Sequence, residues 1–342
     1  MAARLTTYIV ALIVATTFIA GLIVGAQRED GPVDVMVVNG HVYTADGQQT
    51  DAEAVAIQGN KILQIGTTRE IQRLRRPQTV VIDAKGGAVI PGRIERQVDF
   101  LNAGFNADVE VLPKPTRQEE LATLRAATKD AHRRGVTSVH TAGSTPEELE
   151  LFDTLRRDGS LQLRVYGGIA VDEALDKNAL DALDDIRDKY EDDPLFKAGN
   201  ARIIVDDGDA NGFTPGSLEA LIGELDKRGW QLTLHAIGDN AVRMALNAYQ
   251  SAVETNPVPA RGRRHFIVTE TMGPVDYSPF DKLGIVSSLP PGQLAWASFD
   301  EQRKGELERD MLADLVILSD SGVALTIFDG KVVFKKVVDT DN

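Results

Sequence analysis

The sequence predicts an α/β protein that combines an incomplete, degenerate (β/α) TIM-like barrel with a composite β-sandwich and one N-terminal transmembrane helix. Three observations lead to this prediction. Strand and helix patterns alternate through residues 93–302, β-rich segments flank them on both sides, and an uncharged apolar run lies near the start. Repeated βα units without a crossover reversal favour a barrel over an open sheet.

The apolar run covers residues 8–26 and reads YIVALIVATTFIAGLIVGA. As a helix it spans roughly 28 Å, which is close to the hydrocarbon thickness of a bilayer. This length favours an uncleaved anchor, whereas Val24-Gly25-Ala26 also fits a signal-peptide cleavage site, which would yield a secreted protein. Because Arg4 precedes the run, the positive-inside rule places the N-terminus in the cytoplasm and the body on the periplasmic side, as a single-pass membrane protein.

Two glycines in this run, Gly21 and Gly25, have the spacing of a small-xxx-small helix-packing face. Such spacing lets a second helix approach closely. Glycine is also simply common in membrane spans, so the spacing has two readings.

The β-rich ends are residues 34–92 and 303–342, and residues 1–33 form the anchor and linker. Apolar residues alternate in both ends, and turn pairs such as Asn39-Gly40 and Gly86-Gly87 separate the strands. We therefore expect one sandwich domain assembled from both ends of the chain.

The middle, residues 93–302, contains seven predicted strands with helices between them. The strands are expected near 97–100, 136–143, 161–168, 201–208, 231–238, 265–270 and 285–290. The helices are expected near 117–135, 145–159, 177–190, 217–229, 240–255 and 275–283. A complete barrel has eight strands, and no eighth strand pattern is found.

Composition excludes several classes of function. The 342-residue chain has no cysteine, so disulfides, thiolate zinc sites and cysteine nucleophiles are ruled out. Its net charge of −14 argues against nucleic acid as a partner.

Several segments together resemble the amidohydrolase superfamily, in particular the family 3 group of N-acyl and formamide hydrolases. They include VMVVNGHVYTADG, GGAVIPG, QLTLHAIGDNAVRMALNAY and ARGRRHFIVTE. The resemblance covers nearly everything after residue 33 and implies a metal-dependent (β/α) barrel with a composite β-sandwich.

Most metal-ligand positions of that family are changed. The resemblance aligns the family's His-x-His with Gln97 and Asp99, its lysine with Ile203, and a second histidine with Thr269. His235 is kept, and the strand that supplies a catalytic aspartate is absent from the sequence. Zinc chemistry needs about three protein ligands. We therefore expect these positions to be the relic of a metal site. No cofactor is expected, and zinc is not expected either.

A separate acidic segment, DDGDANGF, matches the first half of a calcium loop at Asp207, Asp209 and Asn211. The expected glutamate position holds Leu218. The segment is therefore either a Ca²⁺ loop or a solvated acidic loop.

From these observations the first hypothesis is a non-catalytic pseudoenzyme. It would act as a membrane-anchored, extracytoplasmic accessory subunit of a larger membrane protein complex, for which a respiratory or photosynthetic host is a guess. The second hypothesis is a residual metal-dependent amidohydrolase with a site rebuilt around His235, Asp99 and Asp207. The third is a binding module whose barrel mouth holds a small ligand.

Overall fold

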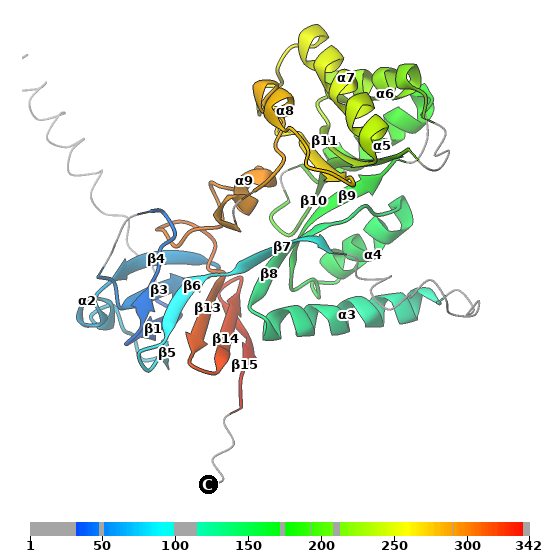
Figure 1. The fold of residues 1–342 in the computed structure, drawn as a ribbon. Coiled ribbons are helices and arrows are strands. Elements are labelled where there is room, and N and C mark those ends of the chain that lie inside the picture. Colours follow the sequence, from blue (N-terminus) through cyan, green and yellow to red (C-terminus); the bar gives the residue numbers. More distant parts are fainter. Residues whose placement is uncertain are drawn as a thin grey trace, which may run out of the picture.

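The computed structural model describes residues 32–47, 51–98, 115–171, 175–191, 193–207, 213–289 and 291–337 (Figure 1). The predicted membrane run at residues 8–26, including Gly21 and Gly25, lies outside these ranges. No helix within them combines the length and apolar character needed to cross a bilayer. The transmembrane part of the predicted fold is therefore without support from the described residues.

The centre of the protein is a parallel sheet of six strands, each paired with the next in chain order. Its strands are β7 (Arg93–Val98), β8 (Val136–Thr141), β9 (Arg164–Ala170), β10 (Phe196–Asp206), β11 (Gln231–Ile237) and β12 (Phe266–Glu270). This order is that of a barrel which stops before closure, so the sheet is a half barrel. The predicted alternation of strand and helix is confirmed for these six strands.

The seventh predicted strand, at 285–290, does not form a strand of this sheet. Val286 makes a single parallel bridge to Phe266 at the sheet edge. Pro290-Pro291 follows at once, and proline offers no N–H to continue a ladder. The barrel is therefore shorter by one strand than the sequence patterns indicate.

Helices cover the convex face of the half barrel (Figure 1). They are α3 (Arg117–Arg133), α4 (Pro146–Arg157), α5 (Lys177–Lys189), α6 (Pro215–Lys227), α7 (Asp239–Thr255) and the short α8 (Ser278–Lys282). Capping boxes at Thr116 and Thr145 begin α3 and α4 by satisfying the first backbone N–H groups. The main apolar core lies between these helices and the sheet, around Trp230 and Tyr249, which are fully buried.

The β-sandwich joins both ends of the chain, as predicted. One sheet has the order β4-β3-β1-β5, and the other has the order β15-β14-β13-β6-β2. The early strands are β1 (Val35–Val38), β2 (His41–Val42), β3 (Ala54–Gln58), β4 (Lys61–Gly66), β5 (Val80–Asp83) and β6 (Ala88–Pro91), with helix α2 (Thr68–Gln72) after β4. The late strands are β13 (Leu315–Ser319), β14 (Gly322–Phe328) and β15 (Lys331–Lys335). The antiparallel pairing of β6 with β13 unites the two ends, whereas β1–β5 and β2–β6 are parallel, so the sheets are mixed.

The segment after the last strand lies across the concave face of the half barrel. It contains a 3-10 turn (Pro291–Gln293) and helix α9 (Leu294–Ala297). Gln231 on β11 donates to the Ala297 carbonyl at 2.9 Å, and Lys304 donates to Ser138 on β8 at 2.7 Å. This segment takes the inner side of the sheet where further barrel strands would close it.

The half barrel and the sandwich are joined through a buried ion pair. Arg164, at the start of β9, contacts Asp314 at 2.6 Å and Asp329 at 2.9 Å. Its side chain is 2% exposed. Because each partner carboxylate belongs to the sandwich, this arginine fixes how the two parts are oriented.

Candidate functional site

The inner side chains of the parallel sheet alternate with those that face the helices. On β11, Leu232, Leu234 and Ala236 are fully buried against the helical layer. Thr233 and His235 lie on the opposite, concave side, as the two-residue period of a strand requires. In barrel folds the residues at the carboxyl ends of the strands carry the chemistry.

The concave side encloses a cavity of about 50 Å³, room for more than one water molecule. All six strands contribute to its lining: Arg96 from β7, His140 from β8, Tyr166 from β9, Asn200 and Arg202 from β10, Gln231 and Thr233 from β11, and Phe266 from β12. Ala297 of α9 covers part of it. The cavity is therefore built by the sheet and closed by the segment that replaces the last strands.

Arg96 brings a positive charge to this cavity. Its guanidinium lies 5.7 Å from the centre of the Phe266 ring, and within the described ranges it has no carboxylate partner. Burial lowers the pKa of Arg96, because the charged form loses hydration. An arginine remains charged even so, and no carboxylate among the described residues compensates this cation.

His140 is the neutral neighbour of that cation. Burial, reinforced by the charges of Lys304 and Arg96, lowers the pKa of His140 to about 3. Its ring packs edge-on against Tyr166, with 5.3 Å between the ring centres. Its buried Nε2 atom has no hydrogen-bond partner in the described structure.

A rigid amide network forms another part of the wall. The Gln231 carbonyl oxygen accepts from the Tyr166 hydroxyl at 3.0 Å and from the Asn200 amide at 3.1 Å. Asn200 also donates to Thr233 at 3.0 Å, and the Gln231 amide donates to the Arg264 carbonyl at 2.9 Å. These bonds fix both side-chain amides and leave little freedom in the wall they form.

A chain of polar contacts runs from the cavity to the carboxyl ends of the strands. Arg202 donates to His235 Nδ1 at 3.0 Å, and His235 Nε2 lies 2.8 Å from Glu270. Since arginine has only donors, Nδ1 accepts and Nε2 carries the proton that is donated to Glu270. Glu270 is 63% exposed, so it stands at the boundary between the site and solvent.

The structure separates most of the predicted relic positions. His235 lies on the concave side, but Ile203 is fully buried among the helices and Thr269 contacts Tyr277 at 2.5 Å. Gln97 lies on β7 with its side chain outside the described residues, as is the whole of Asp99. At the lysine position, Arg202 rather than Ile203 faces the site.

The predicted calcium loop is only partly described, because Asp209 and Asn211 lie outside the described ranges. Asp207 accepts from the backbone N–H groups of Asn240, at 2.7 Å, and of Ala241. It therefore caps α7 from a neighbouring strand, since Gly238 at the N-cap offers no side chain. Both carboxylate oxygens of Asp207 are used in this way.

Sequence reasoning missed Arg96, Asn200, Gln231 and Glu270. The available signal was the two-residue period: Gln231, Thr233 and His235 alternate with three apolar residues on one strand. Motif positions alone do not report which side of a strand faces the cavity.

The described residues contain no group of three or more His, Asp or Glu side chains placed to hold a metal ion. His235 and Glu270 form a pair, and both ring nitrogens of His235 are already engaged. A guanidinium beside His235 also opposes a bound cation by like-charge repulsion. A zinc site with three protein ligands therefore does not fit this part of the chain.

Comparison with known proteins confirms the predicted resemblance. A family model described as the amidohydrolase family matches residues 99–294, which is more than half of the chain. An N-substituted formamide deformylase of Arthrobacter pascens is 31% identical over 94 residues, 27% of this chain and 17% of that protein. The match thus spans less than a fifth of the relative's length.

Solved structures show the same fold. An adenosine deaminase from Xanthomonas campestris with bound Zn has a TM-score of 0.60 and 13% identity, covering 91% of this chain and 95% of that one. A molinate hydrolase has a TM-score of 0.57 and 14% identity, covering 88% and 95%.

Two expectations are corrected by these comparisons. The expectation that the chain is not an enzyme is contradicted, because the family match and the hydrolase neighbours point toward an enzyme. The expectation of no cofactor, with zinc not expected, is contradicted by the match to the amidohydrolase family, among whose structural neighbours is the deaminase with bound Zn. Altered residues at one set of ligand positions do not by themselves remove the chemistry of a site that six strands build.

Proposed function

Because the chain belongs to the amidohydrolase family, we propose that it is a hydrolase of amide-type bonds whose substrate binds inside the half barrel. One observation carries the proposal: polar side chains from six successive strands line a single cavity. A site assembled from many strand ends is the arrangement with which barrel folds perform catalysis.

Substrate binding would use the groups that the cavity offers. The guanidinium of Arg96 provides donors that pair with no carboxylate in the described part of the chain, and the fixed amides of Asn200 and Gln231 shape the wall. Fixed donors stabilise a negatively charged oxygen of a bound substrate. Ala297 and α9 exclude bulk water from one side, which strengthens such contacts.

A base for the attacking water is the second requirement, and Glu270 is the candidate. It stands at the carboxyl end of β12 and accepts a hydrogen bond from His235. Arg202 holds the other side of the His235 ring and also lines the cavity, so Glu270, which is not part of the cavity lining, would act on a water at the mouth of the cavity. A positioned carboxylate of this kind contributes about 10²- to 10⁴-fold to a hydrolysis rate.

The family implies a metal ion that would activate water. The described ligand set does not fit such an ion, so no step of the proposed reaction is assigned to it. Hydrolysis assays should therefore be run both with and without added zinc.

The test is release of amine from N-formyl and N-acetyl amides by the purified protein. Glu270→Gln should lower the rate by about 100-fold or more, since the base is lost. The matched control is Glu254→Gln, which removes the same charge from the exposed end of α7 and should leave the rate unchanged. Absence of amide hydrolysis under both metal conditions would refute the proposed function.

We further propose that residues 8–26 anchor the protein in a membrane, with the barrel on the periplasmic side and a membrane protein complex as its partner. The uncharged sequence supports this proposal. Extraction by detergent but not by alkaline carbonate, followed by native mass measurement, tests both parts. Release by carbonate would exclude the anchor, and a particle of one chain would exclude the complex.

A further inference from the structure

We propose that the cavity of the half barrel binds a small carboxylate anion, held by the guanidinium of Arg96 with the Nε2 atom of His140 beside it. The inference names a substrate class for the proposed function and rests on it for the meaning of the site. Binding of the anion can nevertheless be measured without any turnover.

Arg96 has no carboxylate partner among the described residues. Other buried arginines of the protein face carboxylates: Arg164 faces Asp314, and Arg263 contacts Asp226 at 2.8 Å. The chain has 51 acidic residues, yet none of those described pairs with Arg96. A half-buried cation without a counter-ion is costly, and a bound anion removes that cost.

The buried Nε2 atom of His140 has no hydrogen-bond partner in the described structure. The ring is neutral, so one nitrogen carries a hydrogen that it can donate. Buried polar atoms are normally satisfied, and an exception at a cavity wall indicates a ligand or ordered water. Because His140 and Arg96 line the same cavity, an anion that binds Arg96 lies beside the His140 ring.

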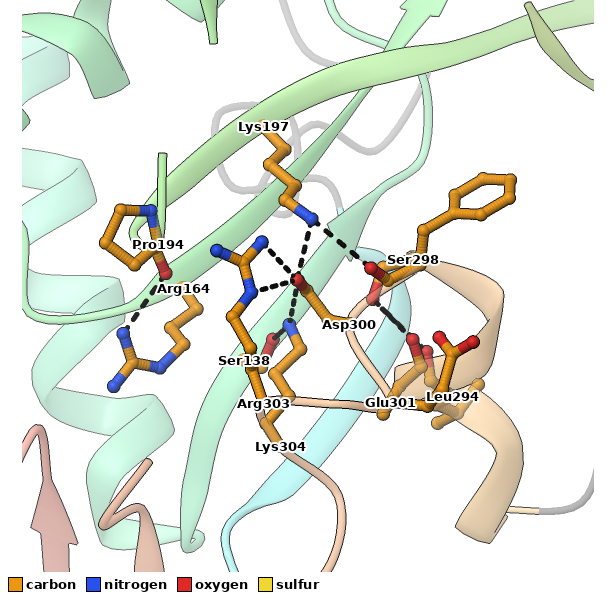
Figure 2. A network of polar contacts seen from close by, with 12 residues as sticks. Ser138, Arg164, Pro194, Lys197, Leu294, Ser298, Asp300, Glu301, Arg303 and Lys304 are labelled. Atoms are coloured by element: carbon orange, nitrogen blue, oxygen red, sulfur yellow. Dashed lines mark hydrogen bonds and ion pairs between the residues drawn. The ribbon is translucent and has the colours of Figure 1, made fainter. Parts of the chain in front are cut away.

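The charged side chains around the cavity are mainly positive. Arg202 supplies a second guanidinium to the lining, and the charge of Lys304 also acts on His140. The nearby carboxylate of Asp300 is already paired with Lys197 at 2.6 Å, as Figure 2 shows. The cavity is therefore a positive site within a protein whose net charge is −14.

Size and shape favour a carboxylate over other anions. A cavity of about 50 Å³ admits a group of only a few heavy atoms. The planar fork of arginine matches the two oxygens of a carboxylate with parallel hydrogen bonds. We therefore expect a substrate or product that carries one terminal carboxylate.

The experiment is titration calorimetry of the purified protein with sodium acetate, and separately with inorganic phosphate and with chloride. Acetate should bind saturably, and Arg96→Gln should weaken it by about 10- to 100-fold. Arg96→Lys keeps the charge without the fork and should give an intermediate loss. Arg69→Gln is the matched control, because it removes the same charge from exposed helix α2 and should bind acetate normally.

Three results would overturn the inference: no acetate binding by the unmodified protein, equal binding by Arg96→Gln, or tighter binding of phosphate than of acetate. Thermal unfolding of each variant shows that a lost signal is not lost structure. The amide assay on the same samples keeps the two proposals apart. Acetate binding without hydrolysis would support the anion site and refute the hydrolase. Hydrolysis without acetate binding would support the hydrolase and refute the anion site.

Discussion

Among the carboxylates in the segment that closes the half barrel, we expect neutralisation of Asp300 to lower the free energy of unfolding the most. Its side chain is 10% exposed and contacts Lys197 at 2.6 Å, Arg303 at 2.7 Å and Lys304 at 3.3 Å (Figure 2). Lys304 is only 5% exposed, and its other contact is the hydroxyl of Ser138. Asp300→Asn would leave this buried ammonium without a counter-charge.

The pKa of Asp300 gives the magnitude. Burial raises this pKa, but the charges of Lys304 and Lys197 outweigh burial and hold the pKa at about 2, from an ordinary value of 3.8. Each pKa unit corresponds to about 1.4 kcal/mol, so the ionised state contributes about 2.5 kcal/mol to folding. Removing one partner of a buried pair costs about 3–5 kcal/mol. We expect Asp300→Asn to lose about 3 kcal/mol at pH 7.

The pH dependence follows from the direction of the shift. Because the folded pKa is depressed, the contribution is complete above the unfolded pKa and is lost as the pH falls through the folded pKa. About half of it should be gone at pH 3. The difference in stability between the unmodified protein and Asp300→Asn should therefore shrink as the solution is acidified.

Urea unfolding at pH 7 and at lower pH measures this difference, and Trp296 in α9 reports on the same segment. Asp320→Asn, in the exposed turn after β13, is the matched control and should change stability by less than about 0.5 kcal/mol. A loss at pH 7 no larger than that of the control would refute the reasoning. So would a loss that stays constant down to pH 3.

Three further predictions concern other parts of the fold. Arg164→Met should lower the free energy of unfolding by about 3–5 kcal/mol, since the buried Asp314 would lose its counter-charge and keep only the backbone N–H of Asp329; a urea midpoint equal to that of the unmodified protein would contradict this. Thr145→Ala should cost about 1 kcal/mol by removing the capping box of α4, and an unchanged thermal midpoint would exclude that role. The pKa of His140, lowered by burial to about 3, should leave its NMR signals constant between pH 5 and 8, whereas a midpoint in that window would disprove its burial. Because that pKa is depressed, the contribution of His140 to stability is complete above about pH 6.5 and declines on acidification.

The order of the strands and helices could be predicted from the sequence, but the side of each strand that faces the cavity could not. The order of strands and helices was predictable because each has its own local period and its own caps, as Thr116 and Thr145 show. Motif positions did not show which residues of each strand face the cavity. Motif alignment selected Ile203 and Thr269, but the sheet turns both away from the cavity. A shift of one residue along a strand exchanges its two faces, so a small alignment error replaces the whole set of candidate side chains.

What the sequence determined by itself was local: the βα alternation of residues 93–302, the β-rich ends that share one sandwich, and the family to which the middle belongs. These follow from side-chain periodicity and from short motifs. Only the tertiary structure decided that the sheet stops at six strands and that α9 and Asp300 occupy its concave side. It also decided that Arg96 lines a cavity in which no described carboxylate pairs with it. Such properties depend on contacts between residues far apart in the chain, such as Lys197 with Asp300, and no local pattern encodes which distant charges meet.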